Sequence, residues 1–304
     1  MAAHEGHWRL ARHPRCHDER CLTCQAELMP ILHAIVLGIV QGLTEFLPIS
    51  SSGHLIVVPW LFGWDDFSDE GIKKAFDVAL HFGTLIAVVA YFRRDVVLLV
   101  RNGVRAVFVP SERANPEGRL AWLLVLSCVP AALVGALFES WIDDTLGGPI
   151  VIAVSLVLFG VVLAWADRRA GSRSLESLNL RDTVLVGAAQ VLALNPGTSR
   201  SGITMSAARL LGYERDAAVR LSFLMSLPVI LGAVVVKVGG LVADGVPDGL
   251  LTPMIVGVIT AAISGWIAVS GLLRLVRTRN FDPFVVYRVA LAALILLVAA
   301  AGWR

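Results

Sequence analysis

Residues 31–64 read ILHAIVLGIVQGLTEFLPISSSGHLIVVPWLFGW, which is two apolar arms separated by a polar break. The first arm covers residues 31–44, the break contains Glu45, Pro48 and the run at 50–54, and apolar residues then return up to Trp64. Each arm is shorter than the roughly 20 residues that a membrane-spanning helix needs. A broken segment at membrane depth is tolerated only where protein or a water-filled cavity satisfies its backbone. The stretch therefore predicts a re-entrant helix-turn-helix hairpin.

A second stretch has the same pattern. Residues 183–194 form an apolar arm, NPGTSRSG follows at 195–202, and a second short arm runs to Leu211. Five residues recur at an offset of 149 positions: Gly38, Gln41, Ser52, Gly53 and Gly63 return as Gly187, Gln190, Ser201, Gly202 and Gly212. A fixed offset that flanks the same kind of break predicts an internal repeat of the hairpin.

The composition places these hairpins in a membrane protein. Of the 304 residues, 56% are hydrophobic and only 16% are charged, whereas soluble domains carry about 25% charged residues. The net charge of +2 leaves no basic field for nucleic acid. Long apolar runs predict six spans, at 75–92, 120–138, 149–166, 221–243, 252–273 and 283–301. We expect an all-α integral membrane protein with six transmembrane helices plus two re-entrant hairpins.

Charge in the connecting segments predicts the orientation. Segments 93–119, 167–182 and 274–282 carry six, four and three arginines, whereas 139–148 and 244–251 carry acids only. The positive-inside rule places the arginine-rich loops in the cytoplasm, with loop 65–74 and both termini outside. Three spans, an odd number, separate the hairpins, so we expect an inverted-topology repeat, with repeat one at about 31–166 and repeat two at about 183–301. Such repeats build polar sites where their broken helices meet.

Residues 1–28 are polar and lack the apolar core of a signal peptide. We expect a disordered extension that precedes a single membrane domain at 29–304. Its cysteines and histidines suggest zinc binding as an alternative, although their spacing matches no regular zinc finger; these residues are Cys16, Cys21, Cys24, His4, His7, His13 and His17.

The first break carries ionisable chemistry. Glu45 lies between apolar residues, and such a carboxylate in a membrane segment indicates a functional site; the alternative is a helix-end carboxylate at the interface. Gln41 lies one turn earlier on the same helix face, and this oxygen pair suits a hard cation such as Mg²⁺ or Ca²⁺. Ser51 and His54 add a hydroxyl and a group that carries protons near neutral pH. Whether Ser51 or a water is the nucleophile stays open.

The second break predicts an anion site. Arg200 lies in the run GTSRSG, and a guanidinium makes a bidentate clamp for phosphate. Hydroxyls and backbone N–H groups where a new helix begins also favour anions, and the candidates are Ser50, Ser199, Ser201 and Thr204. The alternative for each serine is a helix N-cap.

Other charged residues receive simpler interpretations. Asp77 and His81 lie one turn apart on the first span and are candidates to line the cavity. Arg209 and Arg220 are expected to be interfacial anchors, and Trp60 and Trp64 suit the membrane interface.

Both breaks resemble known signatures. QGLTEFLPISSSGH at 41–54 closely resembles the first signature of the undecaprenyl-diphosphate phosphatase family, the bacitracin-resistance proteins, and PGTSRSGIT at 196–204 resembles the second. The resemblance runs from about Met29 to the C-terminus, and Gln41 stands where many members have glutamate. It implies a multi-pass enzyme of the bacterial plasma membrane that hydrolyses the C55 lipid diphosphate to the monophosphate, recycling the cell-wall carrier. It also implies dependence on a divalent cation.

These observations give one hypothesis and two rivals. Glu45, Ser51, His54 and Arg200 are the expected catalytic residues, Gln41 and Glu45 the metal ligands, and the four hydroxyl residues of the breaks bind the substrate. The expected partner is a polyprenyl diphosphate lipid in the membrane, at a site that faces outward; a homodimer stays open. The rivals are a transporter or flippase of a phosphorylated polyprenyl lipid, which the inverted repeat alone favours, and a scaffold without chemistry.

Overall fold

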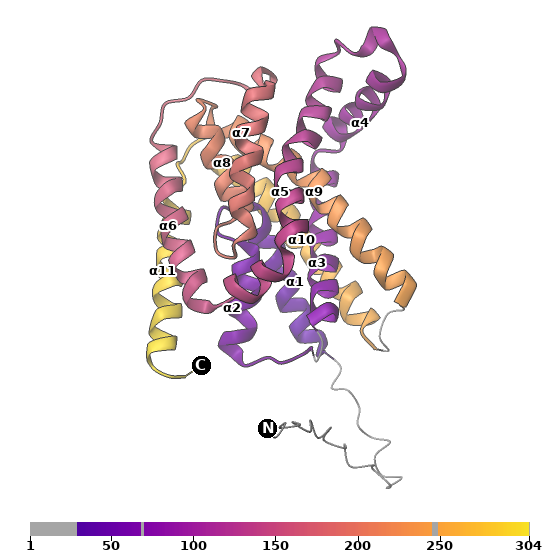
Figure 1. Cartoon of the computed structure of the whole chain (residues 1–304). Helices are drawn as coiled ribbons and strands as arrows, with labels where there is room; N and C mark the ends of the chain where they lie inside the picture. The colour runs from indigo at the N-terminus through magenta and orange to yellow at the C-terminus, as the bar shows by residue number, and fades with distance from the viewer. Residues whose placement is uncertain (1–28, 68–69, 245–248, 304) are drawn as a thin grey trace, which may run out of the picture.

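A computed structural model describes residues 29–67, 70–244 and 249–303 of the chain, which form eleven α-helices (Figure 1). The all-α prediction is confirmed. The N-terminal extension expected at 1–28, with its cysteines and histidines, lies outside the described residues. The helices are α1 (Ile31–Phe46), α2 (Ser51–Phe62), α3 (Glu70–Tyr91), α4 (Arg93–Phe108), α5 (Pro116–Leu146), α6 (Pro149–Asp167), α7 (Leu180–Val191), α8 (Arg200–Leu210), α9 (Arg215–Asp244), α10 (Leu251–Leu275) and α11 (Asp282–Ala300).

The membrane-spanning helices agree with the predicted spans. Within the described ranges, five helices are long and apolar enough to cross a membrane: α5, α6, α9, α10 and α11. Helix α3 is the sixth candidate, and it is bent by 91° from α4. Because each of the six overlaps one apolar run of the sequence, the chain is a multi-pass membrane protein.

Helix α4 differs from the sequence prediction, which placed an arginine-rich loop over 93–119. Arg93–Phe108 is helical, with Asp95 in its first turn, where a negative charge favours the helix dipole. Pro110 begins a short 3-10 turn just past its end, and the residue before a proline is disfavoured in a helix. Arginines lower the mean hydropathy of this segment, but an amphipathic helix needs only one apolar face.

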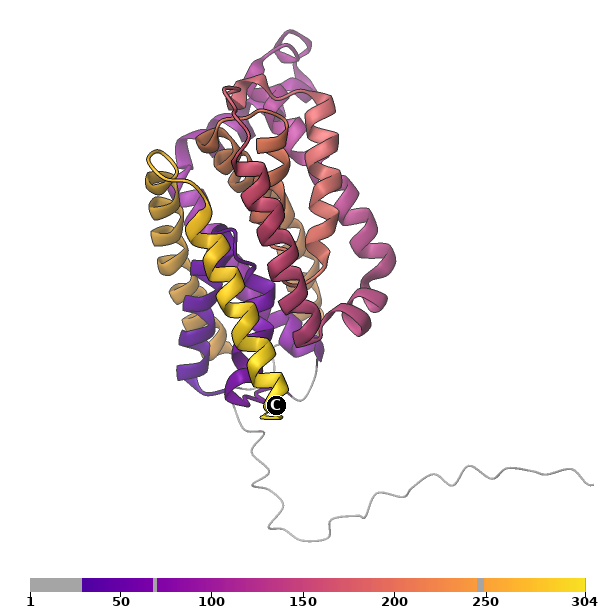
Figure 2. The same cartoon turned by 90° about the vertical axis from the view of Figure 1, so that its left-hand side faces the viewer.

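The two hairpins approach each other from opposite ends of the bundle. In Figures 1 and 2 the α1–α2 hairpin occupies the lower half and the α7–α8 hairpin the upper half. Two hydrogen bonds join their tips: the Gly197 amide donates to Ser50 Oγ at 3.0 Å, and Ser201 Oγ donates to the Leu47 carbonyl at 2.9 Å. The polar breaks therefore meet inside the protein, where they satisfy one another's backbone.

The two breaks also share one backbone conformation. Ser50 and Ser199, which are 149 positions apart, are the only described non-glycine residues with positive φ, and φ is 75° at both. Each is the N-cap of the following helix, and its Oγ accepts from the amide three residues on, Gly53 at 3.3 Å or Gly202 at 3.1 Å. The offset found in the sequence thus has a counterpart in the backbone.

Helix α1 is held closely against α10. A Cβ atom added at Gly42 would lie 2.0 Å from Ser264 Oγ and 2.5 Å from the Ala261 carbonyl. Only glycine permits this approach, as in other membrane helix pairs packed through small residues. The packing fixes α1 and therefore the residues at its C-terminal end.

The open end of the second hairpin is fixed by polar contacts outside the spans. Tyr213 donates its hydroxyl to Asp182 Oδ2 at 2.7 Å, and Arg173 pairs with the same carboxylate while lying 4.4 Å from the Tyr213 ring centroid. Burial, together with the hydrogen bond to Asp182, raises the pKa of Tyr213 to about 12. Arg209, expected to be an interfacial anchor, is instead buried and donates to the Tyr213 carbonyl at 2.6 Å.

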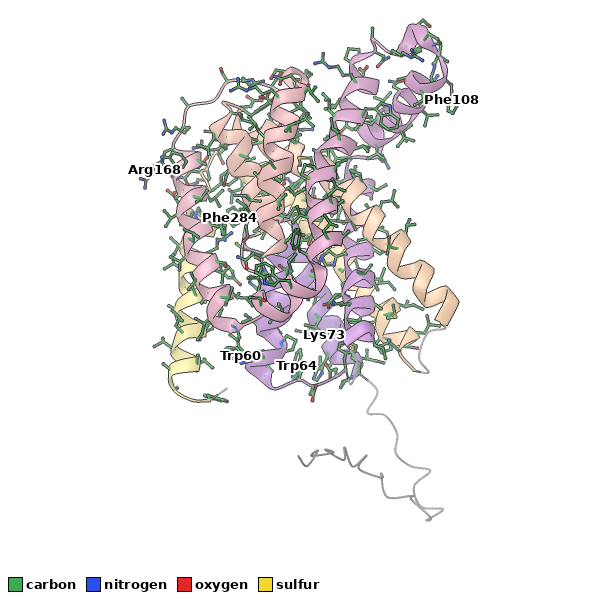
Figure 3. All side chains as sticks on the ribbon, in the orientation of Figure 1. Trp60, Trp64, Lys73, Phe108, Arg168 and Phe284 are labelled. Carbon is green, nitrogen blue, oxygen red and sulfur yellow. The ribbon has the colours of Figure 1, made fainter. Side chains whose placement is uncertain are left out.

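The open end of the first hairpin lies at the other end of the molecule. Trp60 and Trp64 lie near the bottom of Figure 3, whereas Arg168 lies near the top. His33 donates to the Asp66 carboxylate at 2.9 Å and stacks on Trp64 at 3.8 Å between ring centroids. Trp64 and Arg168, which the sequence assigns to opposite sides of the membrane, thus lie toward opposite ends of the molecule.

Candidate active site

Glu45 is the centre of the candidate site. It lies in the last turn of α1, and only 6% of its surface is exposed. Its Oε2 atom accepts a hydrogen bond from Ser51 Oγ at 2.6 Å and another from Gln41 Nε2 at 3.0 Å. Because the chain reverses between α1 and α2, the first residue of α2 returns to the carboxylate. The structure thus brings the predicted carboxylate and hydroxyl within the distance that general-base catalysis needs.

Arg200 completes the site from the second hairpin. It is the first residue of α8, and its Nη2 atom donates to Glu45 Oε1 at 2.8 Å. Its Nη1 atom donates to the Ser222 carbonyl at 3.3 Å, which fixes the guanidinium against α9. One buried carboxylate therefore joins the two hairpins, and the pairing offsets the cost of placing either charge in the protein interior.

His81 approaches the same carboxylate from α3. Its Nε2 atom lies 3.5 Å from Glu45 Oε2, while its Nδ1 atom donates to the Asp77 carbonyl at 2.7 Å. The sequence interpretation of His81 as a residue that lines the site agrees with this position. Because Nδ1 is engaged by the backbone, Nε2 is the ring atom that faces Glu45 and can exchange a proton with it.

His54 does not contact Glu45 but lies between the first break and α11. Its Nδ1 atom donates to the Ser50 carbonyl at 2.6 Å, and its Nε2 atom accepts from the Tyr287 hydroxyl at 2.7 Å. The two rings stack with centroids 5.6 Å apart. Within the described part of the chain, neither nitrogen has a hydrogen bond to Glu45 or Ser51, so His54 braces the first break against α11. The structure does not bring it to the carboxylate as the sequence suggested.

Ser50 and Ser199 act as helix N-caps, the alternative considered from the sequence. Ser50 Oγ accepts from two backbone amides, one in its own helix and one, Gly197, in the other hairpin. Ser199 Oγ accepts from Gly202 and lies 3.0 Å from Ser201 Oγ. Both residues shape the breaks, which positions Ser51 and Arg200 next to them.

The hydroxyls of Ser201 and Thr204 form hydrogen bonds with a neighbouring helix and with the first hairpin. Ser201 Oγ donates to Leu47 of the first hairpin, and Thr204 Oγ1 lies 2.8 Å from Ser222 Oγ on α9. Both residues are almost fully buried. They hold α8 in place behind Arg200, and their role as substrate ligands stays a prediction.

Arg288 is a site residue that sequence reasoning missed. It is fully buried, and among the described residues it donates only to backbone carbonyls of α6 and of both breaks, at distances between 2.8 and 3.3 Å. These carbonyls belong to Leu156, Ser155, Pro48, Gly197 and Thr198. In the sequence it is the one charged residue of the apolar run at 283–301. The rule that singled out Glu45, an ionisable residue inside an apolar segment, would also have found Arg288.

The donor set next to Glu45 fits a hard cation. Gln41 is fully buried, and in the described chain its Oε1 atom has no hydrogen-bond partner. A carboxamide oxygen and a carboxylate oxygen are ligands that Mg²⁺ and Ca²⁺ prefer. No group of three or more His, Cys, Asp or Glu residues that could hold a metal ion occurs among the described residues. The protein therefore offers a partial set, of the kind that Mg²⁺ completes with phosphate and water.

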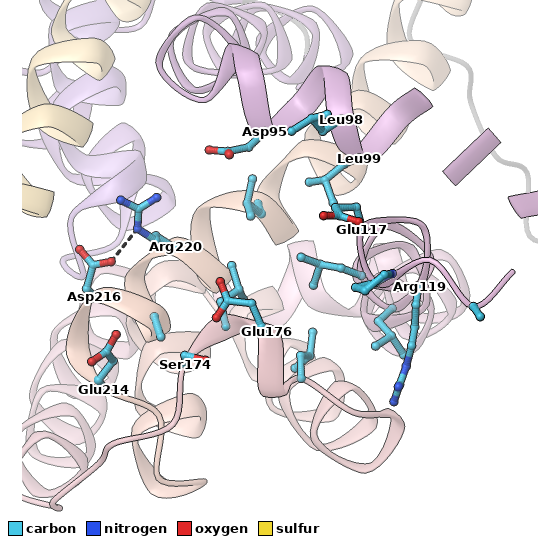
Figure 4. Close-up of a pocket in the computed structure, with 18 residues that line it drawn as sticks. Asp95, Leu98, Leu99, Glu117, Arg119, Ser174, Glu176, Glu214, Asp216 and Arg220 are labelled. Atoms are coloured by element: carbon cyan, nitrogen blue, oxygen red, sulfur yellow. Dashed lines mark hydrogen bonds and ion pairs between the residues drawn. The ribbon is translucent and has the colours of Figure 1, made fainter. Parts of the chain in front are cut away.

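A cavity of about 640 Å³ lies away from this site, at the junction of α4, α5 and α9 (Figure 4). Its walls carry several carboxylates, and Arg220 pairs with Asp216 there at 2.6 Å. Neither Glu45 nor Arg200 lines it. The hairpin tips, rather than this cavity, hold the groups that the sequence singled out.

Comparison with known proteins identifies the family. The family model described as Bacitracin resistance protein BacA matches residues 34–294. An undecaprenyl-diphosphatase of Geobacter metallireducens is 47% identical over 268 residues, 88% of this chain and 97% of the relative. An undecaprenyl-diphosphatase of Moorella thermoacetica is 47% identical over 271 residues, 89% of this chain and 98% of the relative. The matched range contains both polar breaks, and the chain therefore belongs to the bacitracin resistance protein family.

Proposed function

We propose that the chain is an undecaprenyl-diphosphatase, which hydrolyses undecaprenyl diphosphate to undecaprenyl phosphate and phosphate and so recycles the cell-wall lipid carrier. The observation that carries the proposal is the approach of Ser51 Oγ to within 2.6 Å of Glu45, whose other oxygen lies 2.8 Å from Arg200. A hydroxyl, a base and a guanidinium at one point are the groups that phosphoryl transfer requires. The relatives named undecaprenyl-diphosphatase support the choice of substrate.

In the proposed reaction, Arg200 binds the diphosphate and Glu45 takes the proton of Ser51. Ser51 Oγ attacks the terminal phosphorus, and the bond to the bridging oxygen breaks, which releases undecaprenyl phosphate. Glu45 then passes its proton to His81 Nε2, 3.5 Å away, and His81 loses it to solvent. Glu45 next takes a proton from the water that attacks the phosphoserine, the bond between phosphorus and Ser51 Oγ breaks to release phosphate, and Glu45 returns that proton to Ser51 Oγ. When bound to Gln41 Oε1 and Glu45, a divalent cation supplies additional positive charge for the phosphate oxygens.

We further propose that the two hairpins belong to an inverted-topology repeat in the bacterial plasma membrane, with the site open to the outside. The shared φ of 75° at Ser50 and Ser199 and the approach of the hairpins from opposite ends support the repeat. The positive-inside rule applied to the end that carries Arg168 supports the orientation. In cells that express a chain without its native cysteines, a membrane-impermeant maleimide is expected to label Asp65→Cys but not Arg168→Cys. The reverse pattern would refute the orientation.

Phosphate release separates the proposed enzyme from its rivals. Purified protein in detergent, given undecaprenyl diphosphate and Mg²⁺, is expected to release one phosphate per lipid, and Ser51→Ala is expected to release none. A flippase would instead move a fluorescent polyprenyl phosphate across vesicles without phosphate release, and a scaffold would do neither. Equal release by wild type and Ser51→Ala would mean that Ser51 is not the nucleophile.

A further inference from the structure

Helix α4 presents an apolar face that no other helix of the described ranges covers. Val97, Val100 and Val104 are 63%, 61% and 52% exposed, and their spacing of three and four residues places them on one side of the helix. The opposite side carries Asp95, which lines the separate cavity of Figure 4. The helix therefore has a carboxylate side and an apolar side that point in different directions.

The apolar side borders a groove of about 380 Å³ that is lined by apolar residues. Val100 and Val104 line it from α4, with Val89 of α3, Val125 of α5 and Leu231 of α9. The last three belong to helices that are candidate spans, and each is more than a third exposed. The groove thus lies in the angle between α4 and the spans, where α3 and α4 meet at 91°. Because its walls include exposed apolar residues of candidate spans, we expect it to face the hydrocarbon of the membrane.

The groove is preformed because α4 is fixed to α5. Trp122 Nε1 donates to the Gly103 carbonyl of α4 at 3.0 Å. A Cβ atom at Gly118 would lie 2.8 Å from the Asn102 carbonyl, so the two backbones touch. A site that needs no ordering on binding loses less affinity to conformational entropy.

Two arginines lie beside the apolar face. Arg94 and Arg101 are seven residues apart, about two helical turns, and therefore share one flank of α4. Both are exposed, and neither has an ion-pair partner in the part of the chain that the structure describes. Arg105, by contrast, pairs with Glu112 at 2.8 Å.

We propose that this groove binds an acyl chain of an anionic phospholipid whose phosphate is held by Arg94 and Arg101. An acyl chain matches the apolar walls, and a guanidinium forms charge-assisted hydrogen bonds with a phosphate. Basic residues near the surface of an anionic leaflet are attracted to its lipids. The polyprenyl chain of the substrate is the weaker occupant because Glu45, Ser51 and Arg200 do not line the groove.

The charge requirement is tested with the full chain in nanodiscs that contain spin-labelled phosphatidylglycerol or phosphatidylcholine. The wild type is expected to immobilise phosphatidylglycerol preferentially, and Arg94→Gln with Arg101→Gln is expected to reduce that preference at least about threefold. The matched control is Arg168→Gln with Arg279→Gln, which removes the same charge from other exposed arginines of arginine-rich segments. Equal loss in both pairs would mean a general charge effect and would overturn the site.

The groove itself is tested by filling it. Val100→Trp places a large side chain in the groove, whereas Val97→Trp adds the same group at a residue of α4 that does not line it. Native mass spectrometry is expected to show phosphatidylglycerol retained by wild type and Val97→Trp and lost from Val100→Trp. Retention by all three would refute the groove. Displacement of the spin-labelled lipid by stoichiometric undecaprenyl phosphate would instead assign the groove to the substrate chain and contradict the proposal.

Discussion

The two hairpins share the backbone conformation at the N-cap of their second helix but differ in chemistry. Ser51 and Arg200 are 149 positions apart, and each is the first helical residue after a serine N-cap with φ of 75°. One supplies a hydroxyl and the other a guanidinium, and both bond to Glu45. The position equivalent to Glu45 in the second hairpin is Leu194. A shared frame thus produces one site rather than two, because only one hairpin carries the acid.

Gln41 and Gln190 differ in their hydrogen bonds because only the first hairpin carries a carboxylate. Gln41 and Gln190 are equivalent, and both are buried. Gln41 donates to Glu45, whereas neither amide atom of Gln190 has a hydrogen-bond partner within the described residues. A buried polar group without a partner costs about 1–3 kcal/mol. The second hairpin keeps the amide but not the carboxylate that would satisfy it.

The largest effect is expected from the hydroxyl of the first hairpin. Ser51→Ala removes the proposed nucleophile, and kcat is expected to fall at least about 10⁴-fold because no other described hydroxyl bonds to Glu45. Ser52→Ala is the matched control, since Ser52 Oγ contacts Ser50 Oγ at 3.4 Å rather than Glu45. Steady-state phosphate release measures both variants. A loss of less than tenfold in Ser51→Ala would leave Ser51 with a positioning role only.

The second-largest effect on kcat is expected from Glu45, the acid that only the first hairpin carries. Glu45→Gln keeps the size of the side chain but removes the base and the charge opposite Arg200, so kcat is expected to fall about 10³-fold. Because the carboxylate is also a proposed Mg²⁺ ligand, the metal concentration that gives half-maximal rate should rise. Removing the metal with EDTA should abolish the phosphatase activity of the wild type. An unchanged metal titration alongside the reduced rate would confine Glu45 to the role of base.

A smaller loss of activity is expected when the guanidinium of Arg200 in the second hairpin is replaced. Arg200→Lys keeps the charge but not the planar donor pair, and kcat/KM is expected to fall about 10²-fold, on the order of 3 kcal/mol of transition-state stabilisation. Arg220→Lys is the control, because Arg220 pairs with Asp216 away from the hairpin tips. Near-normal turnover in Arg200→Lys would show that a point charge suffices there and that the two hairpins differ less than we propose.

The smallest expected difference is between the two serine N-caps, in how much each contributes to the thermal stability of the protein. Ser50→Ala removes the acceptor of two backbone amides, one in each hairpin, whereas Ser199→Ala removes the acceptor of one amide. Loss of an N-cap costs about 0.5–2 kcal/mol, so Ser50→Ala is expected to lower the Tm in detergent more than Ser199→Ala. A larger drop for Ser199→Ala would contradict the idea that Ser50 joins the two tips.

Local patterns predicted most of the fold and the core of the site. The apolar runs indicated the spans, and the broken segments with their offset of 149 indicated both hairpins. Ser51 lies six residues from Glu45 and at the start of the next helix, so their contact follows from a tight reversal. The helix at 93–108 was missed because its arginines mask an apolar face that only helical periodicity reveals.

Contacts between distant parts of the chain could not be predicted from such patterns. His54 looked like a partner of Glu45, but its hydrogen bond goes to Tyr287, 233 residues away, on a helix whose position depends on tertiary packing. The five carbonyl partners of Arg288 belong to three separate segments of the chain. A single sequence carries no signal for such pairs, although a charged residue inside an apolar span is a signal that would have pointed to Arg288.

The central claim is that the first hairpin supplies the nucleophile and that the second supplies the group that binds phosphate. A rapid-quench experiment tests this claim most directly, with undecaprenyl diphosphate that is labelled in its terminal phosphate. The wild type is expected to yield acid-stable label on Ser51 within the first turnover, Arg200→Lys the same label formed more slowly, and Ser51→Ala none. Absence of protein-bound label in the wild type, together with substantial residual activity in Ser51→Ala, would contradict the account and assign the attack to water.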